Sequence, residues 1–165
     1  MRPLWPHQEK ALALCSAEFK AGHKAVVIVM STGSGKTETA GAMSMRHLAK
    51  RPDGKVLFCA HREELVSQTY DAFTAMGLSC GVIQAKPTRV MNAYRPVQIA
   101  STQTLLARDI LVEGVTLLVL DECHHYMSAQ WYTLGDMYKK RGAYIVGLTA
   151  TPIRGDGRGL GDERV

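Results

Sequence analysis

In AVVIVMSTGSGKT, residues 25–37, an apolar segment passes directly into a glycine-rich one. The segment AVVIVM is rich in β-branched residues and too short for a helix, so it predicts a strand buried on both faces. We expect a helix to follow over residues 35–50 and to end at the turn signal RPDG. A strand, a glycine turn and a helix in this order are typical of a phosphate-binding loop.

The rest of the chain alternates between apolar strands and amphipathic helices. Strands are predicted over residues 55–60, 81–84, 97–100, 116–122 and 143–151, and helices over residues 6–20, 63–76, 102–110 and 128–141. The strongest strand candidates are apolar along their whole length, which is typical of a parallel sheet with helices on both faces. We therefore expect an α/β fold with one domain over residues 1–151 and a glycine-rich tail over residues 152–165.

Composition is that of an ordinary globular protein. Of the 165 residues, 46% are hydrophobic and 21% are charged, and no apolar run reaches the ~18 residues of a membrane span, so we expect a cytoplasmic protein without a membrane partner. The net charge of +5 comes from scattered basic residues and allows binding to polyanions without demonstrating it. The four cysteines form no Cys-x-x-Cys pair, and we expect buried free thiols rather than a zinc site.

The glycine-rich turn carries the groups that hold a nucleotide. Gly33 and Gly35 allow a tight turn whose amides point at phosphate oxygens, and the following helix adds its positive end. Lys36 would reach the β and γ phosphates, and the Thr37 hydroxyl would bind Mg²⁺. The predicted nucleotide-binding residues of this loop are Thr32, Gly33, Ser34, Gly35, Lys36 and Thr37. The generic pattern has glycine where this chain has Met30, and a glycine turn with an exposed lysine remains the alternative.

Asp121 and Glu122 stand at the carboxyl end of the apolar strand TLLVL, where α/β sheets of this kind place their ligands. An acid at this position can hold Mg²⁺ while its neighbour polarises the attacking water. We therefore predict that Asp121 binds the metal ion and that Glu122, with Asp121 and Lys36, carries the catalysis. The phosphate loop and this acidic pair support one another, because phosphoryl transfer requires both.

The sequence Asp121-Glu122-Cys123-His124 resembles the D-E-x-H box of superfamily two helicases and translocases, and MSTGSGKT is similar to their first motif, in which the initial glycine is often replaced. The resemblance extends over nearly the whole chain. It implies the first, RecA-like lobe of a bacterial or phage member, with ATP and Mg²⁺ as cofactors.

Several shorter motifs fit the same resemblance. LWPHQ resembles the upstream glutamine motif, which implies that the Gln8 amide reads adenine; a solvent-facing glutamine is the alternative. AHREEL and STQT resemble two nucleic-acid motifs, which implies phosphate contacts from Arg62 and Thr102; helix capping and a solvated charge run are the alternatives. TATP resembles the motif that couples hydrolysis to strand movement, with the hydroxyls of Thr149 and Thr151 bonding His124.

Helicases of this superfamily bind ATP between two RecA-like lobes, and the second lobe supplies arginine fingers worth ~10³ to 10⁵ in rate. We therefore expect this chain to be the ATP-binding lobe of a helicase or translocase, weakly active alone, with its second lobe in cis or in trans. The expected track is nucleic acid, DNA in preference to RNA. A non-hydrolysing ATP- or nucleic-acid-binding module that regulates a partner is the alternative function.

Overall fold

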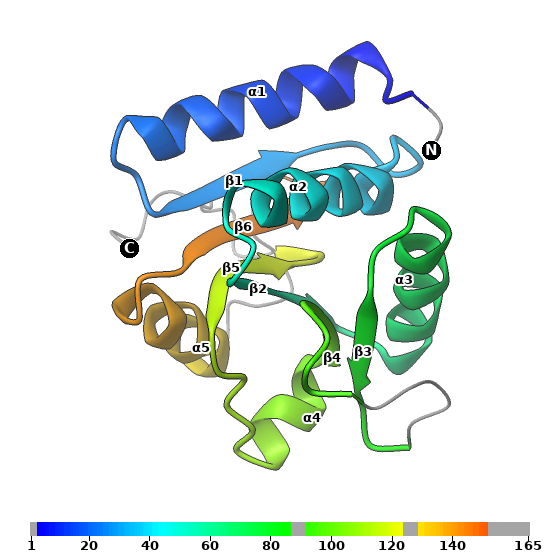
Figure 1. Cartoon of the computed structure of the whole chain (residues 1–165), viewed down its shortest axis with the longest axis vertical. Helices are drawn as coiled ribbons and strands as arrows, with labels where there is room; N and C mark the ends of the chain where they lie inside the picture. Colours follow the sequence, from blue (N-terminus) through cyan, green and yellow to red (C-terminus); the bar gives the residue numbers. More distant parts are fainter. Residues whose placement is uncertain (1–2, 87–91, 124–128, 152–165) are drawn as a thin grey trace.

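The computed structural model describes residues 3–86, 92–123 and 129–151 (Figure 1). The elements in chain order are α1 (Pro6–Lys20), β1 (Ala25–Val29), α2 (Lys36–Lys50), β2 (Lys55–Ala60), α3 (Glu63–Ala75), β3 (Cys80–Ile83), β4 (Val97–Ser101), α4 (Thr102–Ala107), β5 (Val115–Leu120), α5 (Ala129–Lys140) and β6 (Tyr144–Thr149). The predicted tail at residues 152–165 and the predicted coupling residue His124 lie outside the described residues. In the part of the chain that is described, no helix is long and apolar enough to cross a membrane.

The six strands form one sheet in the order β1-β6-β5-β2-β4-β3, and every neighbouring pair is parallel. α1, α2 and α3 pack on one face of this sheet, while α4 and α5 pack on the other (Figure 1). The structure thus confirms the predicted α/β fold with a parallel sheet between two helical layers. Each predicted strand and helix is present, with ends that differ from the predicted ones by a few residues at most.

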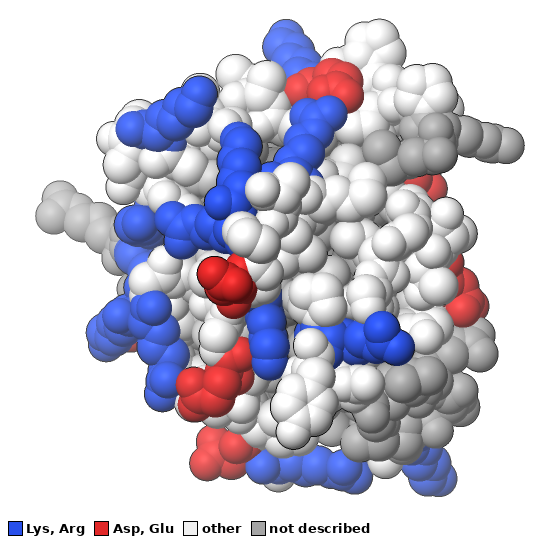
Figure 2. Space-filling model, in the orientation of Figure 1, with Lys and Arg blue, Asp and Glu red and all other residues white. Residues whose placement is uncertain are grey.

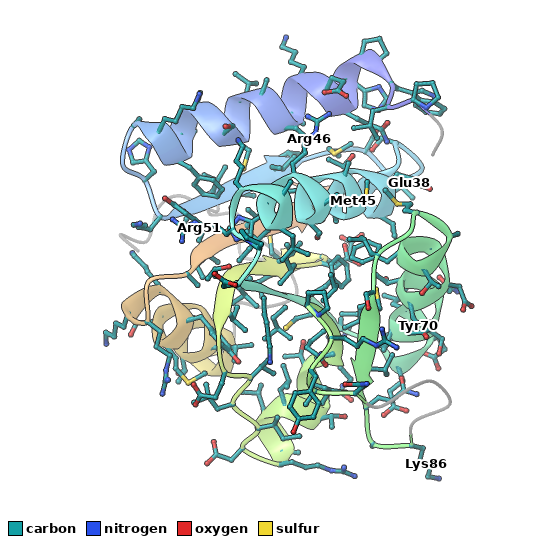
Figure 3. All side chains as sticks on the ribbon, in the orientation of Figure 1. Glu38, Met45, Arg46, Arg51, Tyr70 and Lys86 are labelled. Atoms are coloured by element: carbon teal, nitrogen blue, oxygen red, sulfur yellow. The ribbon has the colours of Figure 1, made fainter. Side chains whose placement is uncertain are left out.

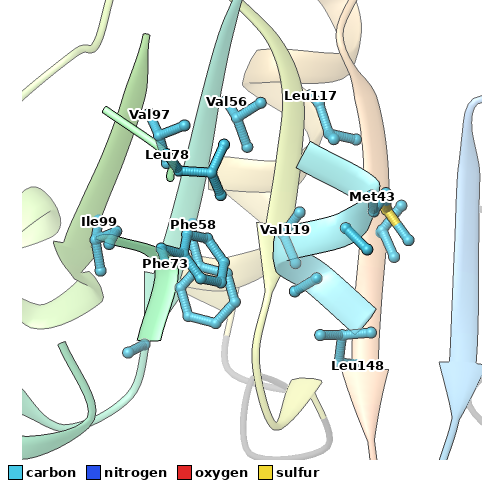
Figure 4. Packing of buried hydrophobic residues seen from close by; sticks show 14 of the residues in the cluster. Met43, Val56, Phe58, Phe73, Leu78, Val97, Ile99, Leu117, Val119 and Leu148 are labelled. Carbon is cyan, nitrogen blue, oxygen red and sulfur yellow. The ribbon is translucent and has the colours of Figure 1, made fainter. Parts of the chain in front are cut away.

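The central strands divide their side chains between two hydrophobic cores. In β2, Phe58 faces α1, α2 and α3, whereas Leu57 faces α4 and α5, and both are fully buried. The Phe58 and Phe73 rings meet edge to face at a centroid distance of 5.4 Å, which joins the sheet to α3 (Figure 4). Burial on both faces explains why this strand reads as an unbroken apolar run in the sequence.

The prediction that residues 25–30 are buried on both faces is wrong for β1. This strand is at the edge of the sheet, where it pairs with β6 alone among the described strands. Ile28 faces the core under α1, but Val27 and Val29 are 44% and 48% exposed on the opposite face. The apolar run in the sequence predicts a strand, but it does not indicate how much of each face the helices cover.

The topology brings the predicted motifs to one edge of the sheet. β1, β6 and β5 are adjacent, so their carboxyl ends lie side by side. The phosphate loop follows β1, Asp121 follows β5, and Thr149 ends β6. Three segments that are far apart in the sequence therefore meet where a parallel sheet commonly places its ligand site.

Candidate active site

The phosphate loop is a turn with two positions whose backbone conformation favours glycine. Gly33 and Gly35 have φ angles of 77° and 81°, in the left-handed region that favours glycine. Gly35 is also the N-cap of α2, and its carbonyl accepts a bond from the Thr39 hydroxyl at 2.8 Å. Within the loop, the Ser34 hydroxyl donates to the Ser31 carbonyl at 2.6 Å. The loop is thus folded by its own bonds, and the amino end of α2 opens toward the site.

Met30 continues the sheet beyond the end of β1. Its amide donates to the Thr149 carbonyl at 2.9 Å, and its side chain is only 7% exposed within the core. The Lys36 ammonium lies 3.4 Å from the Met30 carbonyl, so the backbone at this position supports the loop lysine. A side chain at position 30 therefore does not disturb the turn, which explains why the departure from the generic pattern is tolerated.

Lys36 and Glu122 join the phosphate loop to the acidic pair. The Lys36 Nζ atom lies 3.4 Å from the Glu122 Oε1 atom, and these side chains are only 11% and 27% exposed. Glu122 has a φ of 50°, which a non-glycine residue rarely adopts, and its amide donates to the Asp121 carboxylate at 3.1 Å. This strained turn after β5 directs both carboxyl groups to the edge of the sheet.

Asp121 is the most strongly perturbed acid of the site. Burial, and then the neighbouring charge of Glu122, raise the pKa of Asp121 to about 6. The Glu122 amide and the Lys36 charge act in the opposite direction without cancelling these effects. A buried carboxyl beside a like charge is a group that a divalent cation would stabilise in its ionised form. The described residues hold no group of three or more His, Cys, Asp or Glu that could bind a metal, so Mg²⁺ here would need phosphate and water ligands as well.

Gln8 is buried against the phosphate loop rather than exposed on the first helical turn. Its side chain is 5% exposed, its Nε2 group donates to the Gly35 carbonyl at 3.1 Å, and its Oε1 atom accepts from the Trp5 amide at 2.8 Å. The structure thus rules out the solvent-facing alternative. Adenine recognition by Gln8 stays a prediction, but the geometry does place this amide beside the nucleotide loop.

Thr149 and Thr151 form a turn at the end of β6. The buried Thr149 hydroxyl donates to the Thr151 carbonyl at 3.0 Å and accepts from the Thr151 amide at 3.1 Å. Because Thr149 also bonds Met30 through its carbonyl, this turn is connected directly to the phosphate loop. The predicted bond to His124 involves a residue outside the described part of the chain.

Arg62 and Thr102 follow neighbouring strands, β2 and β4. The exposed Arg62 lines a hollow of about 450 Å³ whose walls also include His61, Glu64 and the acidic-pair residue Glu122. Thr102 is 2% exposed, and its hydroxyl donates to the Ala60 carbonyl at 3.2 Å. The hydroxyl predicted to contact a phosphate is therefore already used inside the protein, and the nucleic-acid contacts of both residues stay predictions.

Comparison with known proteins identifies the family. The family model described as "Type III restriction enzyme, res subunit" matches residues 2–154. The chain belongs to this ResIII family. Its similarity to helicases and its fold confirm the resemblance to the first RecA-like lobe of superfamily two helicases.

Individual relatives agree with this assignment. The chain is 28% identical over 165 residues to irc3 of Schizosaccharomyces pombe, whose name gives it as a candidate mitochondrial ATP-dependent helicase; the match covers 95% of this chain and 27% of that protein. It is 33% identical over 142 residues to MJ1505 of Methanocaldococcus jannaschii, named as a candidate ATP-dependent RNA helicase, with 78% and 18% of the two chains covered. The chain thus spans about a quarter or less of these relatives.

The fold is also that of a solved restriction-modification enzyme. A nuclease-deletion mutant of the type ISP restriction-modification enzyme LlaGI, solved with a DNA substrate mimic, superposes with a TM-score of 0.74. The sequences are 17% identical, and the match covers 98% of this chain and 19% of that one. At this identity the likeness concerns the fold.

Trp5 and His7 are site residues that sequence reasoning missed. The Trp5 side chain is 59% exposed beside Gln8, and its ring meets the His7 ring at 5.4 Å. The His7 Nε2 atom lies 3.0 Å from the Ser34 carbonyl of the phosphate loop. Their position within LWPHQ was the available signal, because a large exposed indole next to a buried amide is suited to stacking on a flat ring.

Proposed function

We propose that this chain is the N-terminal, Mg-ATP-binding lobe of an ATP-dependent nucleic-acid helicase or translocase. The observation that carries the proposal is the 3.4 Å approach of Lys36 to Glu122, which brings the phosphate loop and the acidic pair into one site. A loop lysine alone would support nucleotide binding. A loop lysine next to a carboxylate at the end of a neighbouring strand supports phosphoryl transfer to water.

Each residue of the site has a distinct part in this proposal. The loop amides and the amino end of α2 hold the phosphates, and Lys36 leaves Glu122 to reach the terminal ones. The Thr37 hydroxyl and the Asp121 carboxylate would hold Mg²⁺, which would supply charge neutralisation to the phosphate oxygens. Glu122 then orients the attacking water and accepts its proton. Gln8 and Trp5 bind the base by hydrogen bonding and stacking.

The turn at Thr149 and Thr151 would transmit a change between bound ATP and its products from the phosphate loop to the nucleic-acid contacts. Its direct bond to Met30 means that a shift of the phosphate loop is felt at the end of β6. We infer that His124 completes this connection and that Arg62 contacts the nucleic-acid backbone. The LlaGI structure with a DNA mimic favours DNA as the track, while MJ1505 is named for RNA, so both are to be tested.

The experiment is steady-state ATP hydrolysis by the chain with single-stranded DNA, with RNA and with neither. Lys36→Ala is the blank, and Lys24→Ala, which changes an exposed lysine outside the site, is the matched control. Because arginine fingers from a second lobe would be absent, we expect wild-type turnover close to the blank. Adding a separate second lobe should raise the rate at least tenfold, DNA should raise it further, and Glu122→Gln should abolish the increase.

Two results would contradict the proposal. Rapid, DNA-stimulated turnover by the chain alone would show that it needs no second lobe. Unchanged turnover in Glu122→Gln, once the second lobe is present, would remove Glu122 from the mechanism and favour a regulatory module.

A further inference from the structure

A second hollow, of about 490 Å³, lies at the end of the molecule away from the phosphate loop. It opens where α1 and α2 end and β6 begins. Its floor is apolar and is made by Leu12, Cys15, Phe19, Met43 and Leu117. α2 runs from the phosphate loop to this hollow, whose lining begins at Met43, roughly 10 Å along the helix from Lys36, and reaches Lys50, roughly 20 Å along it.

Four cations surround the mouth of this hollow: Lys20, Lys24, Lys50 and Arg51. Lys20, Lys50 and Arg51 line it, and Lys24 lies over the ring of its wall residue Tyr144. Figure 2 shows Lys and Arg side chains gathered on the left of this face, over the ends of α1 and α2. Within the described part of the chain, none of the four has a carboxylate within 4.0 Å.

Other basic residues near the hollow are paired or neutral, so the unpaired positive charge is confined to its mouth. Arg46, which also lines the hollow, is neutralised by Glu9 at 2.7 Å across α1 and α2 (Figure 3). His47 bonds the Thr116 hydroxyl at 2.8 Å, and burial first, then Arg51 and Lys50, lower the pKa of His47 to about 4. His47 is therefore neutral at pH 7, and no carboxylate of the described residues pairs with the cations at the mouth.

Tyr144 gives the hollow an aromatic wall. The Lys24 Nζ atom is 4.3 Å from the centre of the Tyr144 ring, the Arg51 guanidinium is 5.3 Å from it, and the Phe19 ring is 4.5 Å away. These contacts hold two of the cations in place by cation–π interaction. Their charges are thus preorganised at the mouth, which lowers the entropy lost when an anion binds.

Two simpler roles do not account for the whole arrangement. Cations at the ends of α1 and α2 stabilise the terminal carbonyls, but this role needs neither Lys24, which follows the helix, nor an open apolar floor. Nucleic-acid phosphates would use the cations alone, and a base would need a free aromatic ring to stack on, whereas Lys24 and Arg51 already lie over the Tyr144 ring. An apolar anchor flanked by negative charges uses both features.

We propose that this hollow, which we call the basic hollow, binds an acidic peptide segment of a partner protein. One apolar side chain of the segment enters the floor, and its flanking carboxylates pair with Lys20, Lys24, Lys50 and Arg51. This site is independent of the ATP site and can be occupied while nucleotide is bound. It would give the lobe an attachment point on the side away from the carboxyl ends of the strands.

The test is fluorescence anisotropy with a short labelled peptide of glutamates around a single leucine. We expect saturable binding that weakens roughly tenfold when leucine is replaced by serine, and again roughly tenfold in the Lys50→Glu, Arg51→Glu double variant. Lys10→Glu with Lys86→Glu has the same net charge but alters exposed lysines outside the hollow, and Figure 3 shows Lys86 far from Arg51. This control should bind like the wild type.

Each remaining outcome decides against the proposal. Equal weakening in the control pair would mean general charge attraction. A different result would be loss of peptide binding in the Lys50→Glu, Arg51→Glu variant with no change when the leucine of the peptide is replaced by serine. Together with tight binding of single-stranded DNA that depends on Lys50 and Arg51, it would show that this surface contacts nucleic-acid phosphates. Lys50→Gln with Arg51→Gln removes charge without reversing it, so the test stands even if the double glutamate variant unfolds. Absence of peptide binding at low salt would also overturn the proposal.

Discussion

Gly147 on β6 is the position where a single methyl group should disturb the acidic pair most directly. A Cβ atom at Gly147 would lie 2.9 Å from the Cys123 Sγ atom and 3.2 Å from the Cys123 Cβ atom, inside the ~3.5–4.0 Å of a relaxed contact. Cys123 follows Glu122 directly, so relief of the clash must move the turn that carries the carboxylates. We expect Gly147→Ala to cost about 1–3 kcal/mol of unfolding free energy, the usual penalty for overpacking.

The structure supplies a matched control and a rescue for this substitution. Gly135 on α5 has no atom within 4 Å of the position of its Cβ, so Gly135→Ala should stabilise the chain by about 0.5–1 kcal/mol. Cys123→Ala removes the sulfur atom that Gly147→Ala would meet but keeps the Cβ atom, so the double variant should recover part of the loss.

Thermal unfolding followed by circular dichroism measures these differences. For a domain of this size, 1 kcal/mol corresponds to about 2–4 °C, so Gly147→Ala should lower Tm by roughly 2–12 °C. Equal effects of alanine at Gly147 and Gly135, or no recovery in the Gly147→Ala, Cys123→Ala double variant, would refute the packing argument.

Three further predictions concern single side chains of the proposed ATP site. Because folding raises the pKa of Asp121 to about 6, ionised Asp121 lowers the free energy of unfolding at neutral pH. In urea unfolding at pH 7, Asp121→Asn should therefore be more stable than the wild type. This difference should shrink as the pH falls through 6 toward 4. Gln8→Ala should cost about 1 kcal/mol of stability and reduce discrimination between ATP and GTP in competition binding. Met30→Gly, which restores the generic loop pattern, should cost about 2–5 kcal/mol in urea unfolding without improving Mg-ATP affinity.

Much of the fold follows from local sequence signals. β2, β5 and β6 are short apolar runs between turn residues, and α2 and α3 have helical spacing, so their existence was predictable from periodicity. The two features that local pattern cannot supply are strand order and helix coverage. Strand order and helix coverage determine how exposed Val27 and Val29 are. Because the sequence shows neither, β1 was predicted to be buried on both faces.

The site shows the same division. The meeting of Lys36 with Glu122 was predictable, because the carboxyl ends of parallel strands lie at one edge of the sheet; the catalytic and metal-binding roles of Lys36, Asp121 and Glu122 stay predictions. The burial of the Thr102 hydroxyl against Ala60 was not predictable, because it depends on how closely β2 and β4 approach. Trp5 was missed because an exposed aromatic side chain has no periodic signal of its own.

Calorimetric titration of the chain with Mg-ATP, beside Lys36→Ala and Lys24→Ala, is the direct test of whether the glycine turn binds phosphate. We expect one binding site in the wild type and in Lys24→Ala, at least tenfold weaker affinity in Lys36→Ala, and weaker affinity when Mg²⁺ is withheld. Equal affinity of wild type and Lys36→Ala for Mg-ATP would contradict this expectation, because the glycine turn would then not be the phosphate site.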